Sequence, residues 1–145
     1  MSEQLYLSSR ASEGRILVVD DELSIRKPIR IALSQAGYEV VEASDGGEAI
    51  TALGEGDNPL TIDAILCDIR MPRTDGVDAI HFFRAHFPSI PVIVLTGYPD
   101  CDLAVTLMKM GVRDYLVKPV SRQDLLDVLK YAVDNHMLFK DQFVA

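Results

Sequence analysis

The strongest constraint on the fold is an alternation, repeated five times, of a short apolar run with a longer segment of helical periodicity. Continuous runs of Val, Ile and Leu are typical of strands buried on both faces, as in a parallel sheet. Parallel neighbours need a long crossover between them, and that crossover is usually a helix. The alternation therefore predicts a doubly wound α/β fold, with five parallel strands, right-handed crossovers and helices on both faces of the sheet.

The expected elements follow from the apolar runs and from the residues that start and stop helices. The strands are expected at residues 15–19, 39–43, 62–67, 91–95 and 113–117. The helices are expected at about residues 23–36, 45–54, 76–86, 100–110 and 121–136, with room for the last to extend further. Residues 57–59 are expected to form a loop, and Ser121 with Asp124 predicts a capping box at the start of the last helix. His81, His86 and His136 do not fall at strand ends, so surface positions are expected for all three.

Polar side chains follow four of the five expected strands at the point where each strand ends. They are Asp20 and Asp21 after the first, Asp68 after the third, Thr96 after the fourth and Lys118 after the fifth. The carboxyl ends of parallel strands share one edge of the sheet, and ligands bind there where the strand order reverses. With the strand order 2-1-3-4-5, that point lies between the first and third strands, where the three acids are.

These residue types indicate phosphoryl transfer. Three converging carboxylates repel one another unless a cation neutralises them, and a few carboxylates with water suit Mg2+. A carboxylate such as Asp68 can also act as a nucleophile and form an acyl phosphate. The Lys118 ammonium can balance charge on the transferring group, and the Thr96 hydroxyl can donate to one of its oxygens.

Composition excludes several other classes of protein. The 145 residues are most simply one domain, and the net charge of −8 argues against nucleic-acid binding by it. No stretch approaches the length of a membrane helix. The apolar stretch Leu5–Leu7 is far too short for the core of a signal peptide, so a cytoplasmic protein is expected.

Four motifs in order along the chain carry a family resemblance. They are Val-Val-Asp-Asp-Glu at 18–22, Asp-Ile-Arg-Met-Pro at 68–72 with Gly76, Leu-Thr-Gly at 95–97, and Asp-Tyr-Leu-Val-Lys-Pro at 114–119. Over roughly residues 14–133 the chain resembles the receiver domain of bacterial two-component response regulators. The resemblance implies a flavodoxin-like (βα)5 domain at residues 14–136. Residues 1–13 would be a flexible tail, and residues 137–145 a C-terminal tail or the start of a linker.

The resemblance also implies roles for individual residues. Asp68 would be the phosphoacceptor, taking a phosphoryl group from the phosphohistidine of a histidine kinase or histidine phosphotransfer protein. Mg2+ would be bound directly by Asp21, through water by Asp20, and by the backbone carbonyl of Arg70, with Asp68 also a ligand. Lys118 would contact the phosphoryl group, and the Lys118–Pro119 peptide would be cis.

Signalling would follow from a switch pair, Thr96 and Tyr115. By the resemblance, the Thr96 hydroxyl moves to the phosphoryl group and Tyr115 turns inward into the space vacated. This movement would reshape the face made by the fourth helix, fifth strand and fifth helix, which family members use to form homodimers or to meet targets. Such a domain catalyses its own phosphorylation and dephosphorylation and turns over no outside substrate.

Three alternatives stay open from the sequence. A phosphatase with an aspartate nucleophile often has a second acid two residues later, where this chain has Arg70. A flavodoxin-like cofactor binder would have a Ser/Thr/Gly phosphate loop where this chain has Asp20, Asp21 and Glu22. The third is a receiver-like interaction module that is never phosphorylated, against which the complete set of site residues argues.

Two further expectations concern this chain in particular. Arg70 and Tyr98 are bulky and lie two residues after Asp68 and Thr96, so we hypothesise that they shield an acyl phosphate from water. No output domain follows the last helix, so the chain is either a stand-alone receiver or a piece of a longer regulator. The apolar side chains within residues 135–145 favour a linker helix or a dimer contact.

Overall fold

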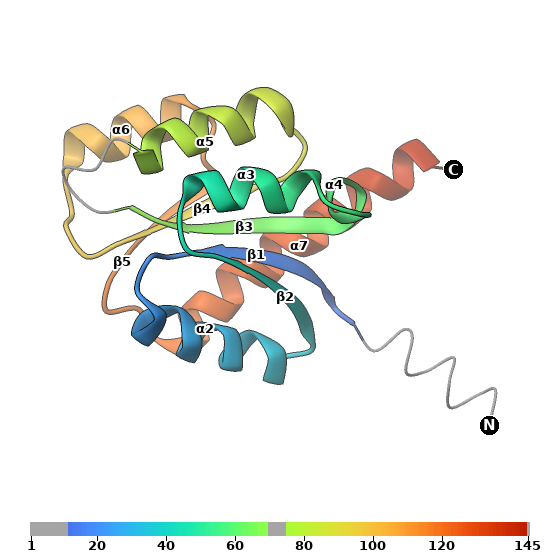
Figure 1. Cartoon of the computed structure of the whole chain (residues 1–145), viewed down its shortest axis with the longest axis horizontal. Helices are drawn as coiled ribbons and strands as arrows, with labels where there is room; N and C mark the ends of the chain where they lie inside the picture. The colour runs from blue at the N-terminus through green and yellow to red at the C-terminus, as the bar shows by residue number, and fades with distance from the viewer. Residues whose placement is uncertain (1–11, 70–74, 145) are drawn as a thin grey trace.

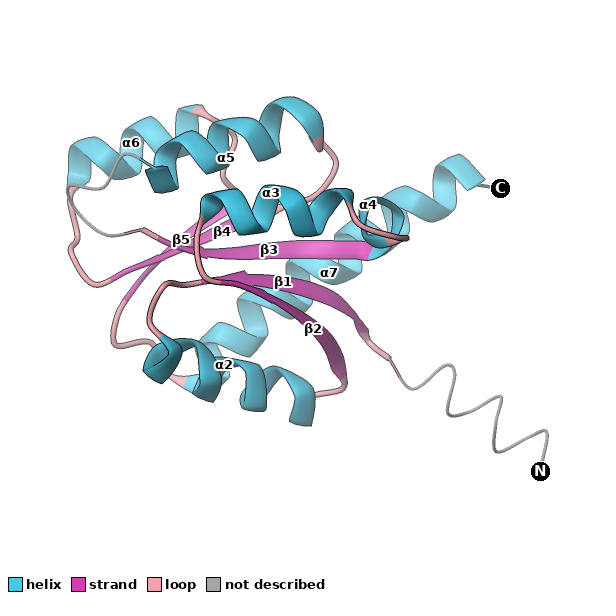
Figure 2. Ribbon diagram, viewed as in Figure 1, coloured by secondary structure: helices cyan, strands magenta, loops and turns pink. Residues whose placement is uncertain are grey.

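The computed structural model describes residues 12–69 and 75–144, and at its centre is a five-stranded sheet. All the neighbouring strands pair in parallel, in the order β2-β1-β3-β4-β5, which confirms the predicted topology. The strands are β1 (Gly14–Val19), β2 (Tyr38–Ala43), β3 (Ile62–Asp68), β4 (Val92–Thr96) and β5 (Asp114–Val117). The central position of β3 explains its apolar run, because helices cover it on both faces (Figure 2).

The helices form a layer on each side of the sheet (Figure 1). One layer contains α3 (Gly46–Gly54), α5 (Asp75–His86) and α6 (Cys101–Lys109). The other contains α2 (Leu23–Gln35) and α7 (Arg122–Val144). Side chains of one strand alternate between the two cores: Leu17 of β1 packs into one, and its neighbours Ile16 and Val18 pack into the other.

Residues 57–59 do not form a simple loop, and that prediction was wrong. Asp57 lies in a turn, but Asn58 and Pro59 belong to a short helix, α4 (Asn58–Thr61), which begins directly after it. The side-chain amide of Asn58 donates to the Ala52 carbonyl at 2.8 Å, and the Thr61 hydroxyl donates to the Asp57 carbonyl at 2.9 Å. Side-chain bonds therefore close a turn too short to leave a periodic signal in the sequence.

The last helix begins as predicted, with the Ser121 hydroxyl oxygen accepting a hydrogen bond from the Asp124 amide at 3.0 Å. It runs to Val144 without a break at residues 136 and 137, so the proposed division there between domain and tail stays a prediction. Of the expected N-terminal tail, residues 1–11 lie outside the described residues. None of the helices within residues 12–69 and 75–144 is long and apolar enough to cross a bilayer.

The expectation of three surface histidines was wrong for one of them. His81 and His86 are exposed, but His136 is only 5% exposed. Its position follows from helical spacing, because Leu129, Ala132 and Val133 are buried on the same face of α7, and residue 136 continues that face one turn later. A buried imidazole needs a polar partner, and Asp63 provides one at 2.9 Å.

Candidate functional site

The predicted site residues lie along the carboxyl edge of the sheet, because the strands that carry them end in register. Val19 of β1 pairs with Cys67 of β3, and Asp68 pairs with Leu95 of β4. Thr96 in turn pairs with Val117 of β5. The residues that follow β1 and β5 therefore emerge beside the last residues of β3 and β4, and one edge carries the whole set.

Three acids meet at this edge. Asp20, Asp21 and Asp68 each offer a carboxylate oxygen, and the three oxygens lie within 4.8 Å of one another. Asp20 is buried, Asp21 is exposed and Asp68 lies between them in exposure. The acids therefore form a pocket that is walled by protein on one side and open to solvent at Asp21.

The loop after β1 is fixed by hydrogen bonds to Asp20. The carboxylate of Asp20 accepts from the Glu22 amide at 2.9 Å, and its backbone carbonyl accepts from Nη1 of Arg26 at 2.6 Å. Arg26 also pairs with Glu42 at 2.9 Å. The sequence analysis missed this supporting arginine, and its only signal is a basic residue in the first turn of the helix that follows the acidic loop.

Lys118 is the cation of the pocket. Its Nζ lies 2.7 Å from Oδ1 of Asp68 and 3.8 Å from Oδ2 of Asp20. The Lys118 amide donates to the Thr96 carbonyl at 2.7 Å, which ties the end of β5 to the end of β4. The Lys118–Pro119 peptide is cis, as predicted.

Electrostatics at Asp68 favour the entry of positive charge. Burial raises the pKa of the Asp68 carboxyl, the hydrogen bond from Lys118 lowers it, and the charges of Asp20 and Asp21 raise it again. The net result is a pKa above the ordinary value. A cation bound beside these carboxylates would favour the ionised form of Asp68.

The predicted switch pair lies beside this pocket. Thr96 is buried, and its hydroxyl oxygen accepts a hydrogen bond from the Tyr98 amide at 3.1 Å. Tyr115 is partly buried against the core, and its hydroxyl oxygen accepts from the Asp100 amide at 3.4 Å. Asp100 caps α6, so the ring of Tyr115 contacts the segment that connects the pocket to that helix. The remaining predicted site residue, Arg70, lies outside the described residues.

Comparisons with known proteins point to one family. The family model described as the response regulator receiver domain matches residues 16–130. A receiver domain protein from Clostridium thermocellum has a similar solved structure, with a TM-score of 0.75 and 35% identity, covering 90% of this chain and 98% of that one.

Curated relatives are longer than this chain. It is 40% identical to the probable transcriptional regulator ycf27 of Cyanophora paradoxa, covering 79% of this chain and 46% of that protein. It is 37% identical to the transcriptional regulatory protein ZraR of Klebsiella oxytoca, covering 81% of this chain and 26% of that protein. The chain thus spans less than half the length of these relatives, and the match to each concerns a part of a larger regulator.

Proposed function

This chain belongs to the response regulator receiver domain family, and we propose that Asp68 is the residue that accepts the phosphoryl group. The observation that carries the proposal is the position of Lys118, with its Nζ 2.7 Å from the Asp68 carboxylate and with Asp20 and Asp21 beside it. A nucleophilic carboxylate, a fixed cation and two further acids at one sheet edge are the groups that phosphoryl transfer requires.

The transfer step uses the Asp68 carboxylate as nucleophile and a phosphohistidine of a histidine kinase or phosphotransfer protein as donor. A carboxylate oxygen of Asp68 forms a bond to phosphorus as the phosphorus–nitrogen bond breaks. The histidine nitrogen leaves with the electron pair of that bond and takes up a proton. Water later attacks phosphorus, which releases inorganic phosphate and restores the carboxylate. Throughout, the Lys118 ammonium balances negative charge on the phosphoryl oxygens.

The acidic pocket suits Mg2+. Asp20, Asp21 and Asp68 would hold the ion with hard oxygen ligands, and the backbone carbonyl of Arg70, outside the described residues, is proposed as a further ligand. When bound, the ion supplies positive charge that offsets the charge of the phosphoryl oxygens. The convergence of three carboxylate oxygens within 4.8 Å of one another supports this assignment, because such a cluster suits a hard divalent cation.

The signal would pass through Thr96 and Tyr115. If the Thr96 hydroxyl turns towards a phosphoryl oxygen, it gives up the hydrogen bond from the Tyr98 amide. If Tyr115 turns inward, it gives up the hydrogen bond from the Asp100 amide at the start of α6. Both movements would change the face formed by α6, β5 and α7, where Val105, Met108 and Val117 are exposed. We propose that this face meets the partner, either a target or a second copy of the chain.

The proposal is tested with phosphoramidate as donor and Mg2+, followed by intact-mass measurement. The wild-type protein is expected to gain one phosphoryl group, and Asp68→Asn is expected to gain none. Asp78→Asn is a matched control, because Asp78 is exposed on α5 and does not belong to the cluster of Asp20, Asp21 and Asp68. Uptake by Asp68→Asn at the wild-type level would overturn the assignment, and no uptake by any variant would favour an interaction module that works without phosphorylation.

A further inference from the structure

A second buried acid lies at the opposite end of the strand that carries Asp68. Asp63, near the start of β3, is 2% exposed. Its Oδ2 accepts a hydrogen bond from the Arg15 amide at 3.1 Å. Its Oδ1 accepts from Nδ1 of His136 at 2.9 Å and lies 2.9 Å from Nζ of Lys140. We call Asp63, His136 and Lys140 the Asp63 cluster.

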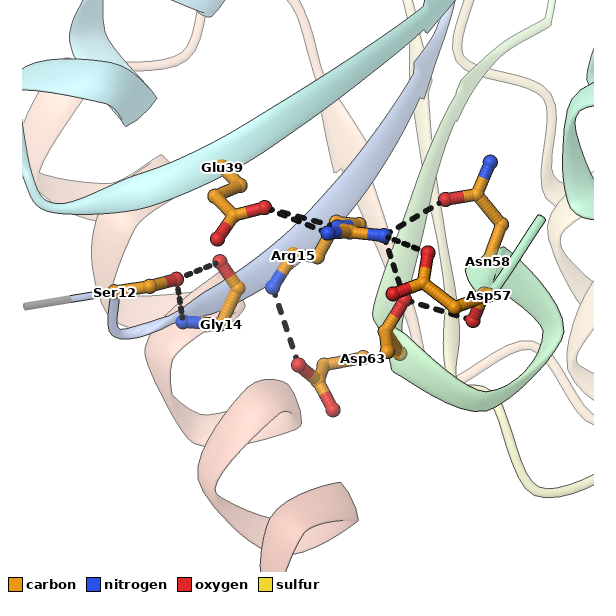
Figure 3. A network of polar contacts seen from close by, with 8 residues as sticks. Ser12, Gly14, Arg15, Glu39, Asp57, Asn58 and Asp63 are labelled. Atoms are coloured by element: carbon orange, nitrogen blue, oxygen red, sulfur yellow. Dashed lines mark hydrogen bonds and ion pairs between the residues drawn. The ribbon is translucent and has the colours of Figure 1, made fainter. Parts of the chain in front are cut away.

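The other charged side chains described near the cluster make their contacts elsewhere and do not reach the Asp63 carboxylate. Figure 3 shows the Arg15 side chain pointing away from Asp63, towards Glu39, Asp57 and Asn58, so the backbone of Arg15 makes the contact. On α7, Asp134 is exposed and pairs with Lys130 at 3.0 Å. Among the described residues, the side chains that reach the Asp63 carboxylate are those of His136 and Lys140, four residues apart on one face of one helix.

Apolar packing of α7 weakens where the cluster begins. Up to Val133, side chains on the inner face are fully buried, including Leu129 and Ala132. Among the side chains described beyond it, Met137 on this face is only partly buried. A helix end whose apolar contacts become fewer frays unless other contacts hold it. The Asp63 cluster supplies such contacts for this end.

The fit of α7 against the sheet is also close at this point. Gly14, the first residue of β1, has φ +146°. A Cβ on Gly14 would lie 2.7 Å from Cγ1 of Val133 and 3.1 Å from Oδ2 of Asp63. Only glycine leaves room for Val133 and the Asp63 carboxylate together, so the backbone of β1 and the cluster meet at one place.

We propose that the Asp63 cluster is a clamp that divides α7 into two parts. Residues 122–133 are held by the apolar core, and residues 134–140 are held by the charge of Asp63. The second part can then detach while the rest of the domain stays folded. Asn135 and His136 of this second part also line a groove. The other residues that line it include Pro88, Pro91, Arg113 and Tyr131. Opening the clamp would therefore release the C-terminal part of α7 and remove Asn135 and His136 from the lining of this groove.

Hydrogen exchange of the full chain, followed by mass spectrometry, tests the clamp. Asp63→Asn removes the charge, and protection of residues 134–140 is expected to fall at least about tenfold and to end well below that of residues 125–133, which stay protected. Lys130→Met is the matched control, because it removes a lysine from an exposed ion pair of similar length, 3.0 Å, on the same helix. It is expected to leave protection of residues 134–140 unchanged.

Two results would overturn the clamp: unchanged protection of residues 134–140 in Asp63→Asn, or protection of residues 125–133 that is abolished together with theirs. If Asp63→Asn does not fold, Lys140→Met decides instead, because Lys140 is partly exposed and its loss leaves His136 on Asp63. Loss of protection at residues 134–140 while residues 125–133 stay protected would then support the clamp. Unchanged protection, or protection abolished along the whole helix, would refute it.

Discussion

Each end of β3 carries a buried aspartate, and the pKa values of the two carboxyls are shifted in opposite directions. Asp68 at the carboxyl end and Asp63 at the amino end both have side chains that are 3% exposed. Burial raises the pKa of both carboxyls and is the largest influence on each. At Asp63, hydrogen bonds from His136, Lys140 and the Arg15 backbone outweigh burial and lower the pKa, whereas at Asp68 the pKa stays raised.

The difference comes from the neighbours. Asp63 meets donors from two elements, and its charge stabilises the native state. Asp68 meets Lys118 but also lies beside two other acids, whose charges raise its pKa. Burial alone therefore does not set the direction of the pKa shift. The acid with a raised pKa is the one that we propose binds a cation and a phosphoryl group.

The largest effect on stability is expected when the charge of Asp63 is removed. Asp63→Asn is expected to lower the free energy of unfolding by about 2–3 kcal/mol, because it leaves Lys140 and His136 without a charged acceptor. Urea denaturation at neutral pH measures the loss. Asp134→Asn, which breaks an exposed pair on the same helix, is expected to cost about 0–0.5 kcal/mol. A cost at Asp63 no larger than this would show that the buried pair contributes nothing.

The pH dependence of stability provides a second test at the same residue. The folded pKa of Asp63 is below its ordinary value of 3.8, so the ionised carboxylate stabilises the fold above that pH. The stabilisation is lost as the pH falls through 3.8 and on through the lowered folded pKa. The gap in stability between the wild type and Asp63→Asn is therefore expected to be full above about pH 5 and to shrink as the pH falls below that. A gap that stays constant down to acid unfolding would contradict this account.

The contrast between the two acids also marks the limit of what the sequence predicts. The convergence of Asp20, Asp21, Asp68, Thr96 and Lys118 was predictable, because parallel strands bring their ends to one edge and each of these residues lies within two positions of the end of an apolar run. The Asp63 cluster was not, since Asp63 and His136 are 73 residues apart and no local pattern links them. Long-range polar pairs of this kind depend on how a helix packs on the sheet, which periodicity alone does not give.

At the other end of β3, the same substitution is expected to act in the opposite direction. Asp68→Asn removes one of three neighbouring carboxylates. Lys118 still has Asp20 as an ion-pair partner, with its Nζ 3.8 Å from Oδ2 of Asp20. The free energy of unfolding in the presence of EDTA is expected to rise by about 0.5–1 kcal/mol. Thermal unfolding measures the change. Asp78→Asn, as an exposed control, is expected to change it little. A loss of stability in Asp68→Asn would mean that Lys118 already compensates the charge.

The smallest expected effect is on the rate at which water dephosphorylates Asp68. Tyr98 is 62% exposed, and its backbone amide, which Tyr98→Ala retains, donates to the Thr96 hydroxyl. The substitution therefore tests the ring as a shield while keeping the contact to the switch residue. The dephosphorylation rate is expected to rise only about threefold, because an exposed ring can cover the phosphoryl group from one side alone. Arg70→Ala tests the other bulky residue in the same assay. Unchanged rates in both variants would remove shielding as an explanation, and the lifetime of the acyl phosphate would then depend on the acids and Lys118.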